Sequence, residues 1–190
     1  SEKILPHFHI PLQSGSDKIL KLMKRRYLRN VYETRFEYIR KRIPNACIGS
    51  DVIVGFPGED ELEFTETYNF LKSIDISYLH VFSYSERSNT SSILLNKKVS
   101  KIIKNERSKI LRELSNSKKL EFYKKNINNS HNVLFETENK NGYIYGYTEN
   151  YVRVKSLWSN SKQNEIVNCY LDSIDSDFSC IAEQAVELKV

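Results

Sequence analysis

The part of the chain that most constrains its fold is an apolar run, residues 46–54, followed by the loop Gly55-Phe56-Pro57-Gly58 and an acidic stretch. Glycine and proline end regular structure, so this order predicts a strand, a tight turn and the N-terminus of a helix. Ligand-binding loops between a parallel strand and a helix have this layout. Comparable loops occur at 12–16 and 84–87.

The first half of the chain alternates between strand-like and helix-like patterns. Strands are expected at 7–12, 46–54 and 76–84. A helix is expected after Ser16 as N-cap, a second from Asn30 with Glu33 completing a capping box, and a third at about 60–73. Such alternation indicates a parallel sheet with right-handed crossovers, on which ligands bind at the carboxyl ends of the strands. The three loops fall at those ends.

A basic segment follows, without glycine or proline, and predicts one long helix over 97–125. It carries 11 basic and 3 acidic residues, hence +8, whereas residues 1–96 carry 13 and 12, hence +1. Residues 126–190 carry 5 and 9, hence −4. The basic helix could follow phosphates, or it could be a lysine-rich solvated face.

The remaining sequence, 126–190, has short β-like runs separated by Asn, Gly, Ser and Asp. These runs are 133–135, 143–147, 151–154, 165–171 and 180–190. Asn141-Gly142 between two of them is a strong hairpin signal. The pattern predicts a small barrel of the kind that binds oligonucleotides. The expected organisation is therefore an α/β piece at 1–96, a connecting helix at 97–125 and a small all-β domain at 126–190.

Several functional classes find no support in the residue pattern. Cys47, Cys169 and Cys180 lie far apart and make no metal-ligand spacing, so no metal ligands are assigned. No apolar run approaches the roughly 20 residues of a membrane span, and sparse cysteines favour a reducing cytoplasm. The histidines are scattered, His80 is expected to be a satisfied core residue, and no nucleophile with its base is recognisable. No catalytic residue is assigned.

The glycine loop at 55–58 could cradle a phosphate. However, Glu59, Asp60, Glu61 and Glu63 would repel a polyphosphate, and no Lys-Ser/Thr follows as in a P-loop. Of the possible ligands, a neutral or cationic one fits better. From this loop alone, a simple turn before an acid-capped helix, without any ligand, is the favoured interpretation. The loop 13–16 offers amide and hydroxyl groups for a ribose or an amino acid, or it is only a turn.

Taken together, the loops resemble one family. The motifs are His9-Ile10-Pro11-Leu12-Gln13-Ser14-Gly15-Ser16, then Met23, Arg25 and Tyr27, then Asp51-Val52-Ile53-Val54-Gly55-Phe56-Pro57-Gly58-Glu59, then Phe82-Ser83-Tyr84-Ser85-Glu86-Arg87. Their order and spacing are similar to the second half of the radical S-adenosylmethionine methylthiotransferases. The stretch 146–154 resembles the TRAM domain of that family, most closely in the branch that acts on threonylcarbamoyladenosine in tRNA.

The resemblance implies the C-terminal half of a partial (β/α) barrel followed by a TRAM-type β-barrel. It implies S-adenosylmethionine and [4Fe–4S] clusters as cofactors, the cluster ligands lying outside this chain, and tRNA as the partner rather than DNA or a membrane. The residues implied to bind S-adenosylmethionine are Gln13, Ser14, Ser16, Asp51, Gly55, Phe56, Phe82 and Tyr84. Those implied to contact RNA are Arg25, Arg87, Tyr151, Arg153 and Lys155.

The resemblance further implies that an N-terminal part of the same protein is missing here, so that this chain alone is inactive. Three other interpretations stay open: a non-catalytic RNA-binding module, a sister enzyme acting on isopentenyladenosine, and one acting on a ribosomal protein. The strand at 7–12 is expected to lie at an exposed apolar edge of its sheet.

Overall fold

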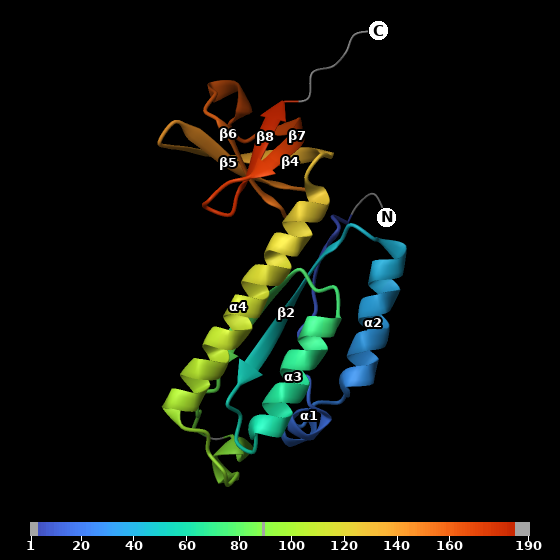
Figure 1. Cartoon of the computed structure of the whole chain (residues 1–190), viewed down its shortest axis with the longest axis vertical. Helices are drawn as coiled ribbons and strands as arrows, with labels where there is room; N and C mark the ends of the chain where they lie inside the picture. Colours follow the sequence, from blue (N-terminus) through green and yellow to red (C-terminus); the bar gives the residue numbers. More distant parts are fainter. Residues whose placement is uncertain (1–3, 89, 185–190) are drawn as a thin grey trace. The chain divides into compact units, whose positions relative to one another are not determined.

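The computed structural model describes residues 4–88 and 90–184. Contacts divide the chain into two compact units, each described separately below (Figure 1). The α/β unit comprises Phe8–Pro44 and Ile48–Lys119. The barrel unit comprises the described parts of Ser1–His7, Asn45–Cys47 and Leu120–Val190. The last six residues of the predicted strand 180–190 lie outside the described residues.

The α/β unit is built on a sheet with the strand order β1-β2-β3, in which β2 and β3 are parallel. Strands alternate with helices along the chain, and β1 is an edge strand. The predicted parallel α/β architecture is therefore confirmed. The elements are β1 (His7–His9), α1 (Asp17–Leu22), α2 (Arg29–Arg42), β2 (Cys47–Val54), α3 (Glu61–Ser73), β3 (Tyr78–Ser83), a 3-10 turn (Ser91–Leu94) and α4 (Lys101–Asn126).

The two faces of this sheet differ in burial. Along β2, Ile48, Val52 and Val54 are almost fully buried, whereas the alternate positions Asp51 and Ile53 are partly exposed. Helices α2 and α3 lie side by side next to β2 in Figure 1, with Tyr32 and Phe70 in edge-to-face contact at 6.1 Å. One face of the sheet therefore forms the core of this unit, and the other face carries polar as well as apolar side chains that are partly exposed.

The N-termini of α1 and α2 differ in part from the capping that the local sequence predicts. The capping box predicted for Asn30 and Glu33 is wrong, because α2 begins at Arg29 with Leu28 as N-cap. A carboxylate outside the helix, Asp17, accepts a hydrogen bond from the Arg29 backbone N–H at 2.8 Å. Ser16 is the N-cap of α1 as predicted, but its side chain makes no cap hydrogen bond.

The barrel unit closes on itself with the strand order β4-β5-β6-β8-β7, which confirms the predicted small β-barrel. Asn141 and Gly142 join β4 to β5 with φ angles of 55° and 84°. Both angles lie in the left-handed region, as a two-residue hairpin of type I′ requires. The strands are β4 (Ser130–Lys140), β5 (Tyr143–Thr148), β6 (Arg153–Leu157), β7 (Ile166–Ile174) and β8 (Cys180–Gln184).

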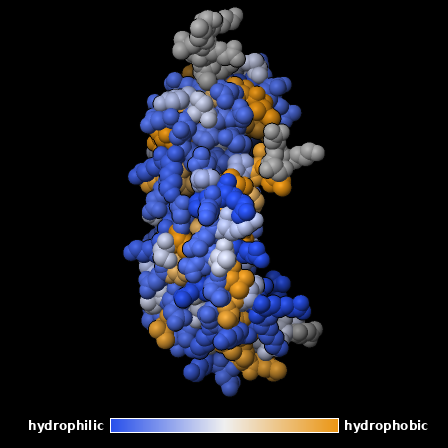
Figure 2. All heavy atoms as spheres, turned by 90° about the vertical axis from the view of Figure 1, so that its right-hand side faces the viewer, coloured by the Kyte–Doolittle hydropathy of each residue, from blue (hydrophilic) through white to orange (hydrophobic). Residues whose placement is uncertain are grey.

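The interior of the barrel is apolar and its surface is mostly polar. Val133, Phe135, Ile144, Val154 and Leu171 are at most 1% exposed. The face of the molecule in Figure 2 is largely hydrophilic, with hydrophobic residues in separate patches. Among the described residues, no helix combines the length and the apolar character that crossing a membrane requires.

Candidate functional site

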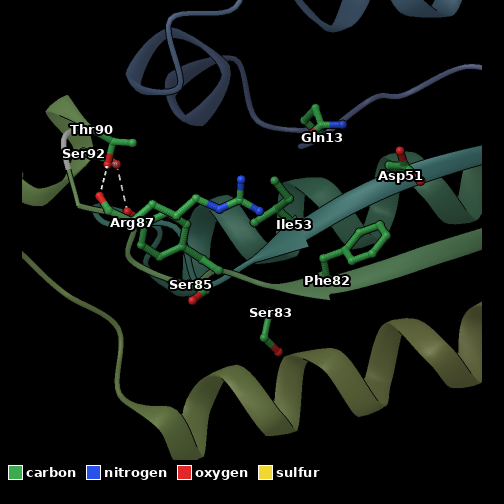
Figure 3. Close-up of a pocket in the computed structure, with 10 residues that line it drawn as sticks. Gln13, Asp51, Ile53, Phe82, Ser83, Ser85, Arg87, Thr90 and Ser92 are labelled. Atoms are coloured by element: carbon green, nitrogen blue, oxygen red, sulfur yellow. Dashed lines mark hydrogen bonds between the residues drawn. The ribbon is translucent and has the colours of Figure 1, made fainter.

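A pocket of about 350 Å³ lies at the carboxyl ends of β2 and β3, where the sequence predicted a ligand (Figure 3). This volume is within the range of small-molecule sites. The lining combines an amide, a carboxylate, a guanidinium and several hydroxyls with the apolar faces of two residues from neighbouring strands. The lining residues are Gln13, Asp51, Ile53, Phe82, Ser83, Tyr84, Ser85, Arg87, Thr90 and Ser92.

Gln13 reaches the pocket because its backbone continues the sheet. It forms an isolated parallel bridge with Val52, and its N–H donates to the Asp51 carbonyl at 2.8 Å. Its φ of 72° turns the chain away directly afterwards. The side-chain oxygen of Gln13 accepts a hydrogen bond from Arg25 Nη2 at 3.0 Å. Arg25, predicted to contact RNA, thus fixes the amide of a predicted cofactor residue.

Half of the predicted cofactor residues do not line the pocket. Ser14 is fully buried, and its hydroxyl lies 3.2 Å from Thr67 Oγ1 in α3. Ser16 is also buried, and no hydrogen-bond partner for its Oγ lies within the described part of the chain. Gly55 and Phe56 are not among the lining residues. In this structure these four residues shape the loops that carry the lining side chains.

Aromatic and basic residues hold the loop after β3. Phe56 makes an edge-to-face contact with Tyr84 at 5.0 Å, and Lys104 Nζ donates to the Tyr84 carbonyl at 3.0 Å. The Tyr84 hydroxyl donates to Ser92 Oγ at 2.8 Å. Figure 3 shows the side chain of Arg87 extending toward Ile53, so that its guanidinium lies in the pocket. A flat cationic group and an aromatic ring thus occur together in the lining.

The acidic turn after Gly58 is built around a buried ion pair that sequence reasoning missed. Glu59 Oε1 accepts hydrogen bonds from the Gly55 N–H at 2.7 Å and from Arg107 Nη1 at 2.8 Å. The Glu59 and Arg107 side chains are 2% and 6% exposed. Burial raises the pKa of Glu59, although both hydrogen bonds oppose the rise. The available signal was the position of Arg107 in the helix, between the apolar residues Ile103 and Ile110.

Other cations also balance this turn. Arg107 Nη2 lies 3.3 Å from Glu61, and Lys18 forms an ion pair with Glu63. The repulsion of a polyphosphate expected from four acidic residues is therefore weaker than the sequence alone indicates. The carboxylates at this helix start serve folding, because Asp60 and Glu63 form a capping box.

A second group of polar residues on the open face of the sheet was also missed. His80 was expected in the core, but its side chain is 55% exposed. Its Nδ1 lies 3.4 Å from Asp51 Oδ1, and His9 Nε2 lies 2.9 Å from the same oxygen. Asp51 and His80 are paired in the β2–β3 register, which the sequence pattern did not reveal.

The barrel unit has its own hollow, of about 820 Å³. Its wall includes stacked rings: Tyr151 lies 4.1 Å from His7 and 4.7 Å from Tyr147 between ring centroids. Tyr151 is 46% exposed, and the Arg153 guanidinium lies over the rings of Tyr145 and Tyr147 at 4.9 and 5.3 Å. Two of the predicted RNA residues, Tyr151 and Arg153, thus belong to one aromatic–cationic cluster.

Lys155, also predicted to contact RNA, lies in a different environment. Its side chain is 8% exposed and forms ion pairs with Asp175 and Asp177. The hydrogen bond to Asp175 is the main cause that raises the pKa of Lys155 to about 12. The ammonium is therefore neutralised within the barrel.

The cysteines do not fit an iron–sulfur cluster. Cys47, Cys169 and Cys180 are all buried. Burial raises the pKa of the Cys169 thiol, whereas a cluster ligand must be a thiolate. Cluster ligands are therefore assigned to none of these residues.

Comparison with known proteins agrees with this geometry. The model of the Radical SAM superfamily matches residues 2–71. The matched range includes Gln13, Asp51 and Ile53 of the pocket lining. The closed five-stranded barrel that follows is consistent with a TRAM domain.

The chain is also similar to curated proteins over most of its length. It is 49% identical over 154 residues to the threonylcarbamoyladenosine tRNA methylthiotransferase MtaB of Aquifex aeolicus, covering 81% of the chain and 36% of that protein. It is 42% identical over 159 residues to the MtaB of Bacillus subtilis, covering 81% and 35%. A tRNA-2-methylthio-N(6)-dimethylallyladenosine synthase of Pelotomaculum thermopropionicum is 36% identical over 148 residues, covering 77% and 33%. The chain spans about a third of the length of these relatives.

Proposed function

We propose that this chain is part of a radical SAM methylthiotransferase that modifies threonylcarbamoyladenosine in tRNA. The observation that carries the proposal is the 49% identity to an MtaB protein over 81% of the chain. That alignment is longer than the α/β unit, so the similarity extends into the barrel unit as well. A tRNA substrate also agrees with the predicted location of the enzyme in the cytoplasm.

The pocket of the α/β unit is the proposed site of S-adenosylmethionine. When bound, this cofactor supplies a reactive sulfonium and, in the radical SAM family, the precursor of a radical. The apolar faces of Phe82 and Ile53 suit a flat heterocycle, and the Gln13 amide suits a ribose hydroxyl or an amino-acid group. The Asp51 carboxylate suits a cation. Asp51 Oδ1 faces the two imidazoles, and its second oxygen makes no hydrogen bond among the described residues.

Arg25 and Arg87 have different roles in this proposal. Arg25 is a positioning residue, because its guanidinium holds the Gln13 amide at 3.0 Å. Arg87 lies in the pocket itself and suits a carboxylate or a phosphate oxygen of a ligand or substrate. The [4Fe–4S] cluster is assigned to another part of the protein, and no role of this chain is derived through it.

The cluster of Tyr145, Tyr147, Tyr151 and Arg153 is the proposed RNA contact of the barrel unit. Bases stack on aromatic rings and on guanidinium planes, and such stacking contributes about 1–3 kcal/mol per base. Since Lys155 is neutralised by two aspartates, we do not propose it as a phosphate contact. The net charge of −4 over 126–190 agrees with an interaction that depends on stacking as well as on charge.

The test of the function uses the complete gene that contains this sequence. Deletion should remove the methylthio derivative of threonylcarbamoyladenosine from hydrolysed cellular tRNA, as measured by nucleoside mass spectrometry. Restoring the gene should return it. If this nucleoside persists and the methylthio derivative of isopentenyladenosine disappears, the proposed substrate is wrong and the sister activity holds. If both persist, the assignment of a tRNA substrate fails.

A binding measurement on the 190-residue chain tests the RNA contact separately. Filter binding to bulk tRNA at low and moderate salt should show an affinity that falls with salt. Arg153→Ala and Tyr151→Ala should weaken binding by about tenfold each, equal to about 1.4 kcal/mol. Arg35→Ala, which removes an exposed charge from α2, is the control for net charge and should change affinity about twofold or less. If all three variants lose tRNA affinity equally, the proposed contact is wrong and binding depends only on general electrostatic attraction.

A further inference from the structure

The group formed by His9, Asp51 and His80 lies on the open face of the sheet, and its two histidines have no part in the proposed chemistry. One side chain comes from each strand, β1, β2 and β3. His9 Nε2 is 2.9 Å and His80 Nδ1 is 3.4 Å from Asp51 Oδ1, and all three ligand atoms lie within 4.8 Å of one another. The three donor atoms thus converge on one small volume.

The backbone fixes this convergence. Asp51 and His80 are register partners on the parallel strands β2 and β3, and the Asp51 carbonyl is held by the Gln13 N–H. On the same face, a side chain at Gly49 would overlap the Tyr78 ring, with a Cβ only 2.1 Å from its Cζ. The absence of a side chain at Gly49 therefore lets Tyr78 pack against the sheet beside the histidines.

Aromatic rings surround both imidazoles. The Tyr78 ring lies 6.3 Å from His9 and 5.2 Å from His80, and the Phe82 ring lies edge-to-face against His80 at 6.4 Å. The two imidazoles are 5.1 Å apart. Such packing restricts the rotamers of both histidines, and a binding site needs ligands that are already oriented.

We propose that His9, Asp51 and His80 bind a divalent transition-metal ion. Zinc and its neighbours bind imidazole nitrogen and carboxylate oxygen at about 2.0–2.2 Å, so adjacent ligand atoms lie about 2.9–3.5 Å apart in tetrahedral or octahedral shells. The two measured separations to Asp51 Oδ1 match this spacing. The remaining separation, between the ligand nitrogens of the two imidazoles, is at most 4.8 Å and would have to shorten when an ion binds.

The chemistry of the donors defines the class of ion. Two imidazoles and one carboxylate suit Zn²⁺, Fe²⁺, Co²⁺ or Ni²⁺, whereas Mg²⁺ and Ca²⁺ prefer oxygen ligands alone. Three protein ligands leave further coordination positions open to water or to a ligand atom. Because Asp51 also lines the pocket, such an ion would border it. The proposal does not depend on the methylthiotransferase function.

The test is metal binding by the 190-residue chain after treatment with a chelator and its removal. Titration with Zn²⁺ in a calorimeter should show one equivalent bound per chain. Titration with Co²⁺ should give visible absorption of nitrogen and oxygen coordination, without the charge-transfer band of thiolates. Asp51→Asn, His9→Ala and His80→Ala should each weaken Zn²⁺ affinity by at least tenfold.

The matched control is His131→Gln in the barrel unit. His131 Nδ1 also lies 2.9 Å from a carboxylate, that of Glu149, but the described residues supply no third ligand there. This variant should bind Zn²⁺ as the wild type does. Circular dichroism without metal should be unchanged for His80→Ala, since that side chain is 55% exposed. No binding by the wild type, a thiolate band, or equal affinity in the Asp51→Asn and His80→Ala variants would overturn the proposal.

Discussion

Removal of the Arg107 side chain tests how the acidic turn beside the pocket is held. In Arg107→Met, the Glu59 carboxylate loses Nη1 at 2.8 Å and keeps the Gly55 N–H at 2.7 Å. Removing one partner of a buried ion pair typically costs about 3–5 kcal/mol. Since one hydrogen bond remains and the carboxylate can take up a proton, we expect a loss of about 3 kcal/mol at about pH 8.

The loss should depend on pH in a defined direction. Burial already raises the pKa of Glu59 above its ordinary value of 4.5, and removal of the cation raises it further. The folded state therefore holds more protons than the unfolded state in the window above 4.5, so stability falls as pH rises through it. Each pH unit within that window changes stability by about 1.4 kcal/mol. We compare the unfolding free energy of the variant with that of the wild type at each pH. The deficit of the variant should be at least about 1 kcal/mol smaller at about pH 5 than at pH 8.

Urea unfolding followed by far-ultraviolet circular dichroism at both pH values measures this loss. The double variant Glu59→Gln/Arg107→Met removes both charges of this buried pair, and we expect its stability to lie within about 1 kcal/mol of the wild type. Arg112→Met, an exposed arginine on the same helix, should change stability by about 0.5 kcal/mol or less. A pH-independent loss, or a double variant as unstable as the single one, would refute the role given to the buried pair.

Three further substitutions test other parts of the structure. Gly15→Ala would place a Cβ 2.7 Å from Thr67 Cα in α3, and we expect a loss of about 1–3 kcal/mol in urea unfolding. Gly142→Ala has open space but a φ of 84°, so the barrel should lose about 1 kcal/mol by strain alone, measured by the fluorescence of Trp158. Hydrogen bonds from Ser179 and Lys155 hold the pKa of Asp177 below its ordinary value of 3.8 despite burial, so this stabilisation is present above 3.8 and lost on further acidification. The melting temperature of Lys155→Met should therefore fall less steeply on acidification than that of the wild type.

The fold was predictable because its signals are local and repeated. Alternating strand and helix patterns, with the glycine loop at 55–58 between them, indicated the parallel sheet and the position of its ligand pocket. Asn141-Gly142 indicated a hairpin because these two residue types tolerate the left-handed backbone that a two-residue turn requires. Gln13, Asp51, Phe82, Tyr84 and Arg87 line this pocket together, since the carboxyl ends of parallel strands meet at one edge of the sheet. Their roles in binding stay predictions.

The missed features all depend on residues that are distant in the sequence. Arg107 and Glu59 are separated by 48 positions, and nothing local marks them as partners. The meeting of Asp51 with His80 depends on strand register, which an apolar run leaves undetermined. Likewise, the Asp17 carboxylate accepts a hydrogen bond from the first N–H of α2, and the helix begins there instead of at the local capping signal. In each case a polar group finds its partner in a tertiary contact, whereas the local sequence pattern indicated a different environment for that group.

The topology of the barrel has a consequence for the time course of folding. Strands β4, β5 and β6 follow one another along the chain, but β6 pairs with β8 through Val154–Cys180 and Lys155–Ile181. Bringing such distant segments together costs loop entropy before any contact repays it, and folding slows accordingly. During synthesis the strands β4–β6 therefore cannot close into a barrel until Cys180, the first residue of β8, has left the ribosome. The rate-limiting event in this unit should be the arrival and docking of β8, long after the helices of the α/β unit have formed.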